Sequence, residues 1–498
     1  MTDTPISPLS ETDTSRTATA EAAASTARND TISRKDLPSI DASNGNLAEL
    51  SQEAWAALLA AAEDLGIYRR VGKLVRTERG SDGEIDIVPM TPDRVRYALA
   101  RAAIFFDGTK DKEPPVHPPM SAVRDILATP QPALRELEGT VRRPFVAPSG
   151  KLITESGYCA ECRVLLIEED GLKIPAISRD PSEAELSEAR SLIVGDLLPD
   201  FPFISQGDRA HAVAMLLAPL TRNLVDGPAP LHLITKSMPG TGAGLLLELM
   251  GIISVGRGVA VMTEGASDEE TRKRLTSKLN TAPRLVVIDN VIRKLDSPAL
   301  AAALTTTVWE DRIIGTSTLA RISTRGVTWV ATGNNVELSL ELARRSIMIK
   351  MDSGVAQPWR RSDFKHGDLK LWATENRGRL IWALLTMVAA WLHQERPSPV
   401  QPQTLGSFEK WSAVIGGILS VAGIDGFLAN VSDLYASADR EGELFKAFVS
   451  HWWATHSTKK VGGHGRDSSR RHWHGRSSPR QALVPGSARG RPVDCRPL

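Results

Sequence analysis

The chain of 498 residues carries 60 basic and 59 acidic residues, so its composition alone gives no argument for nucleic-acid binding. Its three cysteines, Cys159, Cys162 and Cys495, cannot build a disulfide framework in a chain of this length, which predicts a cytoplasmic protein. No stretch reaches the roughly 20 apolar residues of a membrane helix, and no apolar secretory signal opens the chain. We therefore expect no membrane partner.

The N-terminal third predicts a tail followed by a small domain. Residues 1–46 are rich in Thr, Ser and Ala and contain no aromatic residue, which predicts a disordered tail. Residues 47–190 predict a small α/β domain. It would start with a helix capped by Ser51, continue with the strands YRRVGKLVRTE and EIDIVPM, and include a helix that begins at Pro92.

Cys159 and Cys162 form a Cys-x-x-Cys pair that suggests two readings. A structural zinc site needs four ligands, and no second pair of Cys or His lies nearby in the sequence. The pair stands between two strand-like runs. We therefore interpret it as part of a hairpin turn.

The central segment, residues 191–352, changes to an α/β pattern. Its short apolar runs PLHLIT, RLVVIDN (284–290) and VTWVATGNN (327–335) are separated by helical stretches. Such runs predict a parallel sheet that helices cover on both faces. Residues 353–456 predict a helical domain. Its expected core residues are Trp372, Trp382, Trp391 and Trp411.

A glycine-rich loop, SMPGTG, joins the first of these strands to the helix AGLLLELMGII. A P-loop has the pattern G-x-x-x-x-G-K-[ST] and binds phosphate through backbone N–H groups and the helix N-terminus. Here Ser237 takes the first Gly position, Ala243 the Lys position and Gly244 the Ser/Thr position, so an ordinary glycine turn is the alternative reading. The candidate nucleotide-binding residues are Pro239, Gly240, Thr241, Gly242, Ala243 and Gly244.

Polar residues follow the next two buried strands. Asp289 ends the strand LVVID, where a carboxylate can hold Mg²⁺ near the β- and γ-phosphates, and Asn290 lies beside it. Asn334 ends the strand WVAT, where an amide can orient the attacking water. Arg344 and Arg345 follow and could act as fingers on the nucleotide of a neighbouring subunit. The order of these elements predicts a catalytic site.

The segments PGTG, VVIDN, ATGNN and the following ARR resemble AAA+ P-loop ATPases, in particular the superfamily 3-like, primase-associated replication helicases of phages and integrative elements. The segment LGSFEKWSAVIGGIL at 405–419 is similar to the lid of that group, and the resemblance covers about residues 60–455. It implies an AAA+ ATPase core at 191–352, a helical lid at 353–456, ATP and Mg²⁺ as cofactors, and a hexameric ring that acts on single-stranded DNA or a replication fork. Residues 50–190 contain no carboxylate cluster that would indicate a primase site.

The chain departs from this group at Ala243, where the relatives carry the lysine that neutralises β- and γ-phosphate charge. Losing one such contact costs several kcal/mol of transition-state stabilisation. We therefore predict a degenerate helicase-like ATPase of a phage or mobile element, with hydrolysis weak or lost. Two alternatives stay open: an active DNA-dependent ATPase or helicase that uses an unconventional P-loop, or a non-hydrolysing ring scaffold that binds nucleotide and DNA. In the first, Lys236 before the loop could fold over the phosphates.

The segment EDRIIGTSTLARIS predicts a β-hairpin between the second and third strands. The related helicases insert such a hairpin into the ring channel to grip the DNA backbone. The resemblance therefore implies phosphate contacts from Arg312, Thr316, Ser317 and Arg321. An ordinary surface hairpin with exposed arginines is the alternative.

Residues 457–498 mix Arg, Gly, Pro, Ser and His without apolar periodicity, which predicts a basic disordered tail. One reading is a nucleic-acid-binding arm. We favour another, in which a frameshift in GC-rich DNA replaced the original end of the chain.

Overall fold

The computed structural model describes residues 37–80, 85–130, 132–169, 171–313, 319–399 and 403–456, and side chains of 440–444 are not described. The predicted C-terminal tail at 457–498 and most of the predicted N-terminal tail lie outside these ranges. The chain divides into two compact units, Met1–Arg440 and Glu441–Leu498. Across the described ranges, no helix is both long enough and apolar enough to cross a membrane.

The structured part of the chain begins earlier than predicted. Strand β1 (Ser39–Asp41) lies within the expected tail and pairs in parallel with β5 (Ile104–Phe106), because the side chain of Ile40 is buried in the core of this region. Helix α2 also begins before the predicted Ser51. It spans Leu47–Ala60 and is capped by Asn46, whose side chain accepts a hydrogen bond from the Ala48 amide at 3.2 Å.

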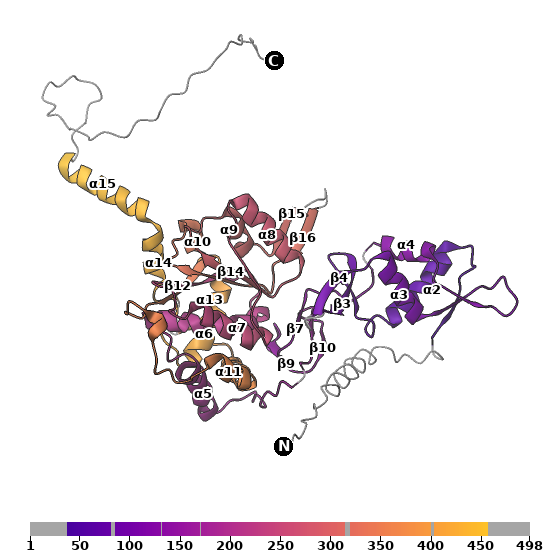
Figure 1. Ribbon diagram of the computed structural model, residues 1–498, viewed down its shortest axis with the longest axis horizontal. Helices are drawn as coiled ribbons and strands as arrows, with labels where there is room; N and C mark the ends of the chain where they lie inside the picture. The colour runs from indigo at the N-terminus through magenta and orange to yellow at the C-terminus, as the bar shows by residue number, and fades with distance from the viewer. Residues whose placement is uncertain are drawn as a thin grey trace, which may run out of the picture. The chain divides into compact units, whose positions relative to one another are not determined.

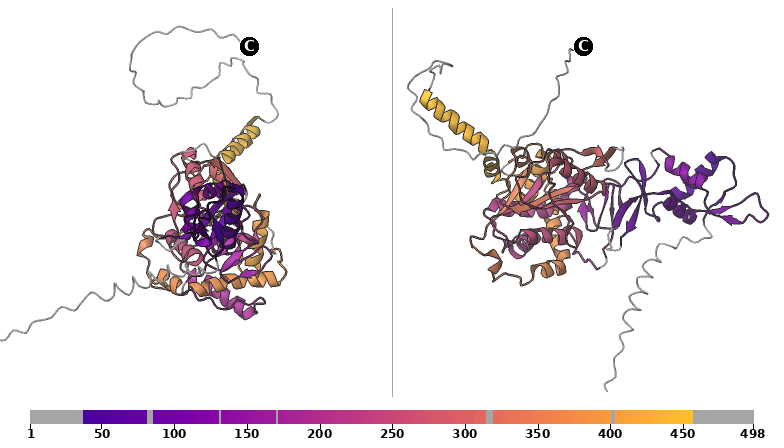
Figure 2. Two further views of the ribbon diagram at one scale, coloured as in Figure 1. Left: turned by 90° about the vertical axis from the view of Figure 1, so that its right-hand side faces the viewer. Right: turned by 45° about the horizontal axis from the view of Figure 1, so that its top comes forward.

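Three helices surround that core and lie side by side (Figures 1 and 2). They are α2, α3 (Pro92–Ala102) and α4 (Met120–Ala128). Helix α3 starts at Pro92 as predicted, with the Thr91 hydroxyl accepting from the Arg94 amide. The predicted strand YRRVGKLVRTE is instead two strands that turn at Val71 and Gly72, both of which have positive φ. The resulting antiparallel sheet consists of β2 (Ile67–Arg70), β3 (Lys73–Arg79) and β4 (Ile85–Pro89).

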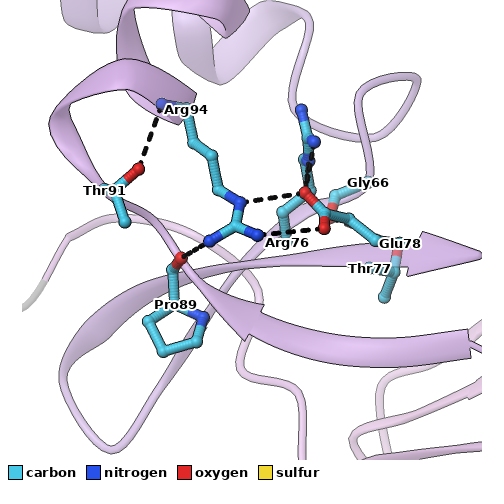
Figure 3. A network of polar contacts seen from close by, with 7 residues as sticks. All are labelled: Gly66, Arg76, Thr77, Glu78, Pro89, Thr91 and Arg94. Atoms are coloured by element: carbon cyan, nitrogen blue, oxygen red, sulfur yellow. Dashed lines mark hydrogen bonds and ion pairs between the residues drawn. The ribbon is translucent and has the colours of Figure 1, made fainter. Parts of the chain in front are cut away.

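A charged network ties this sheet to α3 (Figure 3). Arg94 donates from Nε and Nη2 to the two carboxylate oxygens of Glu78, at 3.0 and 3.2 Å, and from Nη1 to the Pro89 carbonyl oxygen. Arg76 pairs with the same carboxylate. Burial raises the pKa of Glu78, but the hydrogen bonds from Arg94 and Arg76 outweigh it and hold the pKa below its ordinary value.

The Cys159–Cys162 segment forms the predicted hairpin. Cys159 ends β10 (Gly157–Cys159), which pairs antiparallel with β11 (Val164–Leu166), and Cys162 lies in the turn between them. Strand β11 also pairs in parallel with β7 (Gly139–Val141). The other short strands of this region are β6 (Pro115–Val116), β8 (Phe145–Val146) and β9 (Leu152–Ile153).

A five-stranded, all-parallel sheet forms the centre of the larger unit, with strand order β13-β14-β17-β12-β18. Its strands are β12 (Leu231–Lys236), β13 (Val261–Met262), β14 (Leu285–Val291), β17 (Thr328–Asn334) and β18 (Ser346–Met351). Strands β12, β14 and β17 are the three predicted ones. Because all strands run in the same direction, the loops that follow them meet at one edge.

Helices cover both faces of the sheet, as Figure 1 shows. Ile234, Val287 and Val330 pack on one side with α6 and α7, whereas Leu233 and Ile288 pack on the other with α8 and α9. The helices of this part are α5 (Glu183–Arg190), α6 (Gln206–Thr221), α7 (Ala243–Val255), α8 (Asp268–Asn280), α9 (Pro298–Thr305) and α10 (Leu340–Ala343). This α/β architecture, with its five-stranded, all-parallel sheet, is consistent with a P-loop NTPase fold.

The predicted helical segment packs on the face of the sheet that α6 and α7 cover. Trp382, Trp391 and Trp411 are buried there, and Trp372 is half-buried against the same core. The helices are α11 (Leu369–Glu375), α12 (Arg377–His393), α13 (Glu409–Val421) and α14 (Val431–Ala438). Helix α15 (Arg440–His456) lies almost wholly in the second unit.

Candidate nucleotide-binding site

The glycine-rich loop follows β12, the strand that pairs with both β17 and β18. Gly240 and Gly242 have φ values of 79° and 107°, in the left-handed region where glycine is favoured. The Thr241 hydroxyl donates to the Met238 carbonyl oxygen at 2.6 Å and closes the turn. Helix α7 then begins at Ala243, and Gly242 supplies no side-chain cap. The first N–H groups of α7 are therefore available to an anion.

Two other segments pack closely on this loop. A Cβ atom on Gly240 would lie 3.1 Å from Cβ of Trp359 and 3.2 Å from its backbone nitrogen. A Cβ atom on Gly242 would lie 3.4 Å from the ring of Phe201. Gly240 is therefore favoured by space as well as by conformation, whereas Gly242 is favoured by its conformation alone. The side chain of Trp359 itself is exposed.

The lysine position of the loop has no positive charge. Ala243 is buried in the core that α7 shares with the sheet. Gly244 offers no hydroxyl for Mg²⁺, although a Cβ atom there would meet no other atom within 4 Å. Lys236 is the nearest lysine that precedes the loop. Side chains alternate along a strand, so half-buried Lys236 lies on the same face of β12 as Ile234, the face that α7 covers.

Asp289 lies near the carboxyl end of β14, as predicted, and is half-buried. Its Oδ1 atom accepts hydrogen bonds from the Thr332 hydroxyl and from the Asn290 amide, the latter at 2.9 Å. The Asn290 amide also donates to the Thr332 hydroxyl oxygen at 3.2 Å. Among the described residues no hydrogen bond falls on Oδ2, so that oxygen can face a cation. Thr332 is a site residue that the sequence analysis missed.

A single carboxylate is enough for the metal that the site would need. The described residues contain no group of three or more His, Cys, Asp and Glu that could hold a metal ion. Magnesium in nucleotide sites takes one or two carboxylates and fills its remaining positions with phosphate oxygens and water. Asp289 fits that role, and a bound Mg²⁺ would neutralise phosphate charge there.

The two asparagines at the end of β17 have different surroundings. Asn334 pairs in register with Lys236 on β12 and has an exposed side chain. Asn335 donates its amide to the Lys236 carbonyl oxygen at 2.9 Å, and its Nδ2 atom donates to the Ser237 carbonyl oxygen at 3.2 Å. Asn335 therefore anchors the start of the loop, while Asn334 stays available to a ligand.

Arg344 and Arg345 lie at the opposite edge of the sheet from the loop. Arg345 immediately precedes β18, and its carbonyl oxygen accepts from the amide of Leu231, the first residue of β12. The six residues of β12 separate this edge from the loop by about 17 Å, more than one side chain spans. Arg345 is also paired with the Glu341 carboxylate at 2.7 Å, whereas Arg344 is exposed. Neither arginine can reach the loop of its own chain.

The predicted hairpin is present as β15 (Val308–Arg312) and β16 (Leu319–Ser323), which pair antiparallel. Arg312 stands at the tip end of its strand and is exposed. Arg321 forms an ion pair with Glu310 across the hairpin at 3.1 Å, so part of its charge is already neutralised. Thr316 and Ser317 lie outside the described residues.

No protein-family model and no curated protein sequence matches the chain. Among solved structures, the C-terminal region of NrS-1 is similar over 74% of both chains, with 10% identity and a TM-score of 0.38. The active helicase Cch of SCCmec type IV is similar over 77% of this chain and 71% of its own, with 12% identity and a TM-score of 0.28. The JCV helicase is similar over 50% and 70%, with 12% identity and a TM-score of 0.21.

Proposed function

We propose that the chain is a degenerate, AAA+ helicase-like ATPase of a phage or mobile element, acting in DNA replication, with ATP hydrolysis weak or lost. One observation carries the proposal. The loop keeps its left-handed glycines, its Thr241 turn and an open helix N-terminus, and follows its strand at the same edge of the sheet as Asp289, but has buried Ala243 where a mobile cation would be needed. Backbone N–H groups alone support weak phosphate binding, whereas transfer of the γ-phosphoryl group also needs charge neutralisation.

The test compares nucleotide binding with turnover. We expect a fluorescent ATP analogue to bind with Mg²⁺ and to be released by excess ATP, while phosphate release stays near background with or without single-stranded DNA. Turnover of about 1 s⁻¹ or faster, within the usual enzyme range, would instead favour the active-ATPase alternative. Lys236 is then the first residue to replace, because it lies on the α7 face of β12 directly before the loop. Binding without turnover in assembled rings fits the scaffold alternative as well as a degenerate enzyme.

The DNA-binding part of the proposal depends on the β15–β16 hairpin. Arg312 lies at the end of β15 that is next to the hairpin tip. It takes no part in the ion pair between Arg321 and Glu310. Removing an arginine that contacts a phosphate weakens DNA binding about equally for all DNA sequences. It also reduces the slope of log affinity against log salt concentration by about 1. We expect this for Arg312→Ala with a short oligothymidylate, and a smaller effect for Arg321→Ala. Equal, negligible effects would identify an ordinary surface hairpin.

Assembly into a ring, with a hexamer as the expected form, would bring Arg344 of one subunit to the nucleotide of the next. The position of Arg344 supports this proposal, because exposed Arg344 lies at the edge of the sheet opposite the glycine-rich loop of its own chain. Sedimentation at micromolar protein with a non-hydrolysable ATP analogue and Mg²⁺ tests it. A monomer under all conditions would contradict it.

A further inference from the structure

A cavity of about 340 Å³ lies at the end of α7 away from the glycine-rich loop. It is lined by the end of β7, by the last residues of α7 and the segment that follows them, and by the segment that joins α8 to β14. Helix α7 has 13 residues, so its two ends are about 20 Å apart. The charged lining residues are Asp86, Arg142, Arg143, Arg257, Lys278 and Arg284. Among the described lining residues, one acidic residue thus accompanies five basic ones.

Arg143 is the most unusual of these residues. It follows β7, is only 3% exposed, and lines both this cavity and a larger neighbouring one of about 1080 Å³. Its Nε atom is buried without a hydrogen-bond partner, and no described residue forms a hydrogen bond or ion pair with its guanidinium. Burial, together with the nearby charges of Arg377 and Arg284, lowers the pKa of Arg143 to about 9. A buried charge without a partner is strongly destabilising.

Arg284 contributes a second buried guanidinium, on which the charge of the Glu138 carboxylate acts favourably. Its Nε and Nη2 atoms are buried without hydrogen-bond partners, and burial lowers its pKa. Two glycines make room for it: a Cβ atom on Gly139 would lie 2.6 Å from Nε, and one on Gly326 would lie 1.8 Å from Nη1. Side chains at either position would displace this guanidinium.

Arg377 borders the cluster on the side of α12. Its Nη1 atom pairs with Glu169 at 2.6 Å, but its Nε and Nη2 atoms are buried without partners. Glu169 also faces Nε of Arg142 at 3.9 Å, so this carboxylate is shared. The negative end of α7 can stabilise one nearby cation by about 1 kcal/mol. That is too little to account for several buried guanidinium groups with donors unused.

We infer that this cavity is an anion site that takes the phosphate group of a small ligand, with Arg143 and Arg284 as its principal donors. The planar fork of a guanidinium matches two oxygens of one phosphate, and Arg143 and Arg284 both have buried donors without a partner. The volume is at the lower end of the range for small-molecule sites, which favours a free phosphate compound over a polymer. The site is separate from the glycine-rich loop and does not rest on the proposed ATPase activity.

Thermal unfolding with inorganic phosphate tests the inference, and two variants separate the two ends of α7. Arg143→Met removes the buried charge with little change in volume. Gly244→Glu places a negative charge at the loop, where a new side chain meets no atom within 4 Å. About 10 mM phosphate should raise the melting temperature of the wild type and of Gly244→Glu by roughly 2 °C, and that of Arg143→Met by much less, because only the weak phosphate binding of the loop remains there.

Two further measurements on variants of Arg143 test the same inference. Without phosphate, Arg143→Met should melt above the wild type, because it no longer buries an unpaired charge. Arg143→Lys keeps the charge but loses the fork, so it should need about tenfold more phosphate for the same shift. No shift in the wild type, an undiminished shift in Arg143→Met, or a shift lost in Gly244→Glu would overturn the inference. So would a shift caused by oligothymidylate but not by inorganic phosphate.

Discussion

The hydroxyl of Thr332 donates its hydrogen to Oδ1 of Asp289, across from β17 to β14. That hydrogen bond occupies one carboxylate oxygen, and no described residue forms a hydrogen bond with the other. The geometry gives Thr332 a positioning role toward the proposed magnesium site. The two residues lie on neighbouring strands, where the pairing of β14 with β17 is interrupted by an irregularity between Ile288 and Val291.

Thr332→Val should weaken Mg²⁺-dependent nucleotide binding about tenfold, since a hydrogen bond to a charged group contributes about 1.5–3 kcal/mol. Binding measured in EDTA should change little. Thr328→Val is the matched control, because Thr328 lies on the same strand with a buried hydroxyl that lacks a hydrogen-bond partner. An equal loss with and without Mg²⁺ would contradict the positioning role.

Restoring the missing charge should restore turnover. Ala243→Lys combined with Gly244→Thr supplies the phosphate-binding ammonium and a hydroxyl for the metal, and the new side chain at 244 has space. We expect phosphate release to rise at least about a hundredfold, the scale of one key electrostatic contact. Asp289→Asn in the same background should abolish the gain. A restored loop without any gain would mean that other parts of the site have also been lost.

The two arginines before β18 should behave differently. Arg344→Ala, made in the background with the restored loop, should lower turnover by a factor of about 10³ or more, as the loss of an arginine finger does. It should leave nucleotide affinity of the monomer unchanged. Arg345→Ala should act mainly on stability, because Arg345 is paired with Glu341 within its own chain. The reverse pattern would assign the finger to Arg345.

His232 predicts a pH dependence of stability. It is fully buried on β12 against the edge of Trp411, both ring nitrogens lack partners, and burial lowers its pKa to about 3. The unfolded chain therefore binds a proton near pH 6.5 that the folded chain binds only near pH 3. Stability should fall by about 1.4 kcal/mol per pH unit as pH decreases between these values.

His232→Phe should remove that part of the acid sensitivity, which denaturant unfolding at pH 7 and pH 4.5 would measure. Buried His211, whose pKa is also lowered by burial, adds a second contribution that the variant leaves in place. Exposed His451 on α15 provides the control, because His451→Gln should leave the pH dependence unchanged. A dependence identical in wild type and His232→Phe would exclude the buried ring as its source.

Strands β12, β14 and β17 could be predicted because each is a continuous apolar run that ends in a turn or a polar tip. Strand β13 could not, since it has two residues, and β18 was missed because its run SIMIKM is interrupted by Lys350. The start of α2 was misplaced because Asn46 offers an earlier cap than Ser51. Packing decides which of two nearby residues caps a helix. Here the start at Asn46 places Leu50 within the helix, where its side chain is buried.

In the site, Asp289 and Asn334 could be predicted because each lies at the end of a buried strand. The ends of parallel strands meet at one edge of the sheet. The contacts of Thr332 and Asn335 could not, since they depend on the register between β12, β14 and β17. The buried arginines were missed for a different reason. Arginine is usually exposed, and nothing local to Arg143 in the sequence indicates that β7 and α7 will enclose it.

The apolar core beneath α7 has a practical consequence for dissecting the chain. Ile234 of the sheet and Leu247 of α7 share that core with Trp391 and Trp411, which come from beyond residue 353. Cutting the chain at the predicted boundary between 352 and 353 would leave one face of the sheet uncovered. A fragment ending there should aggregate, whereas a fragment that continues through α14 keeps this face of the sheet covered by helices. Melting of the longer fragment should then be a single cooperative step, in which the sheet and the C-terminal helices lose structure together.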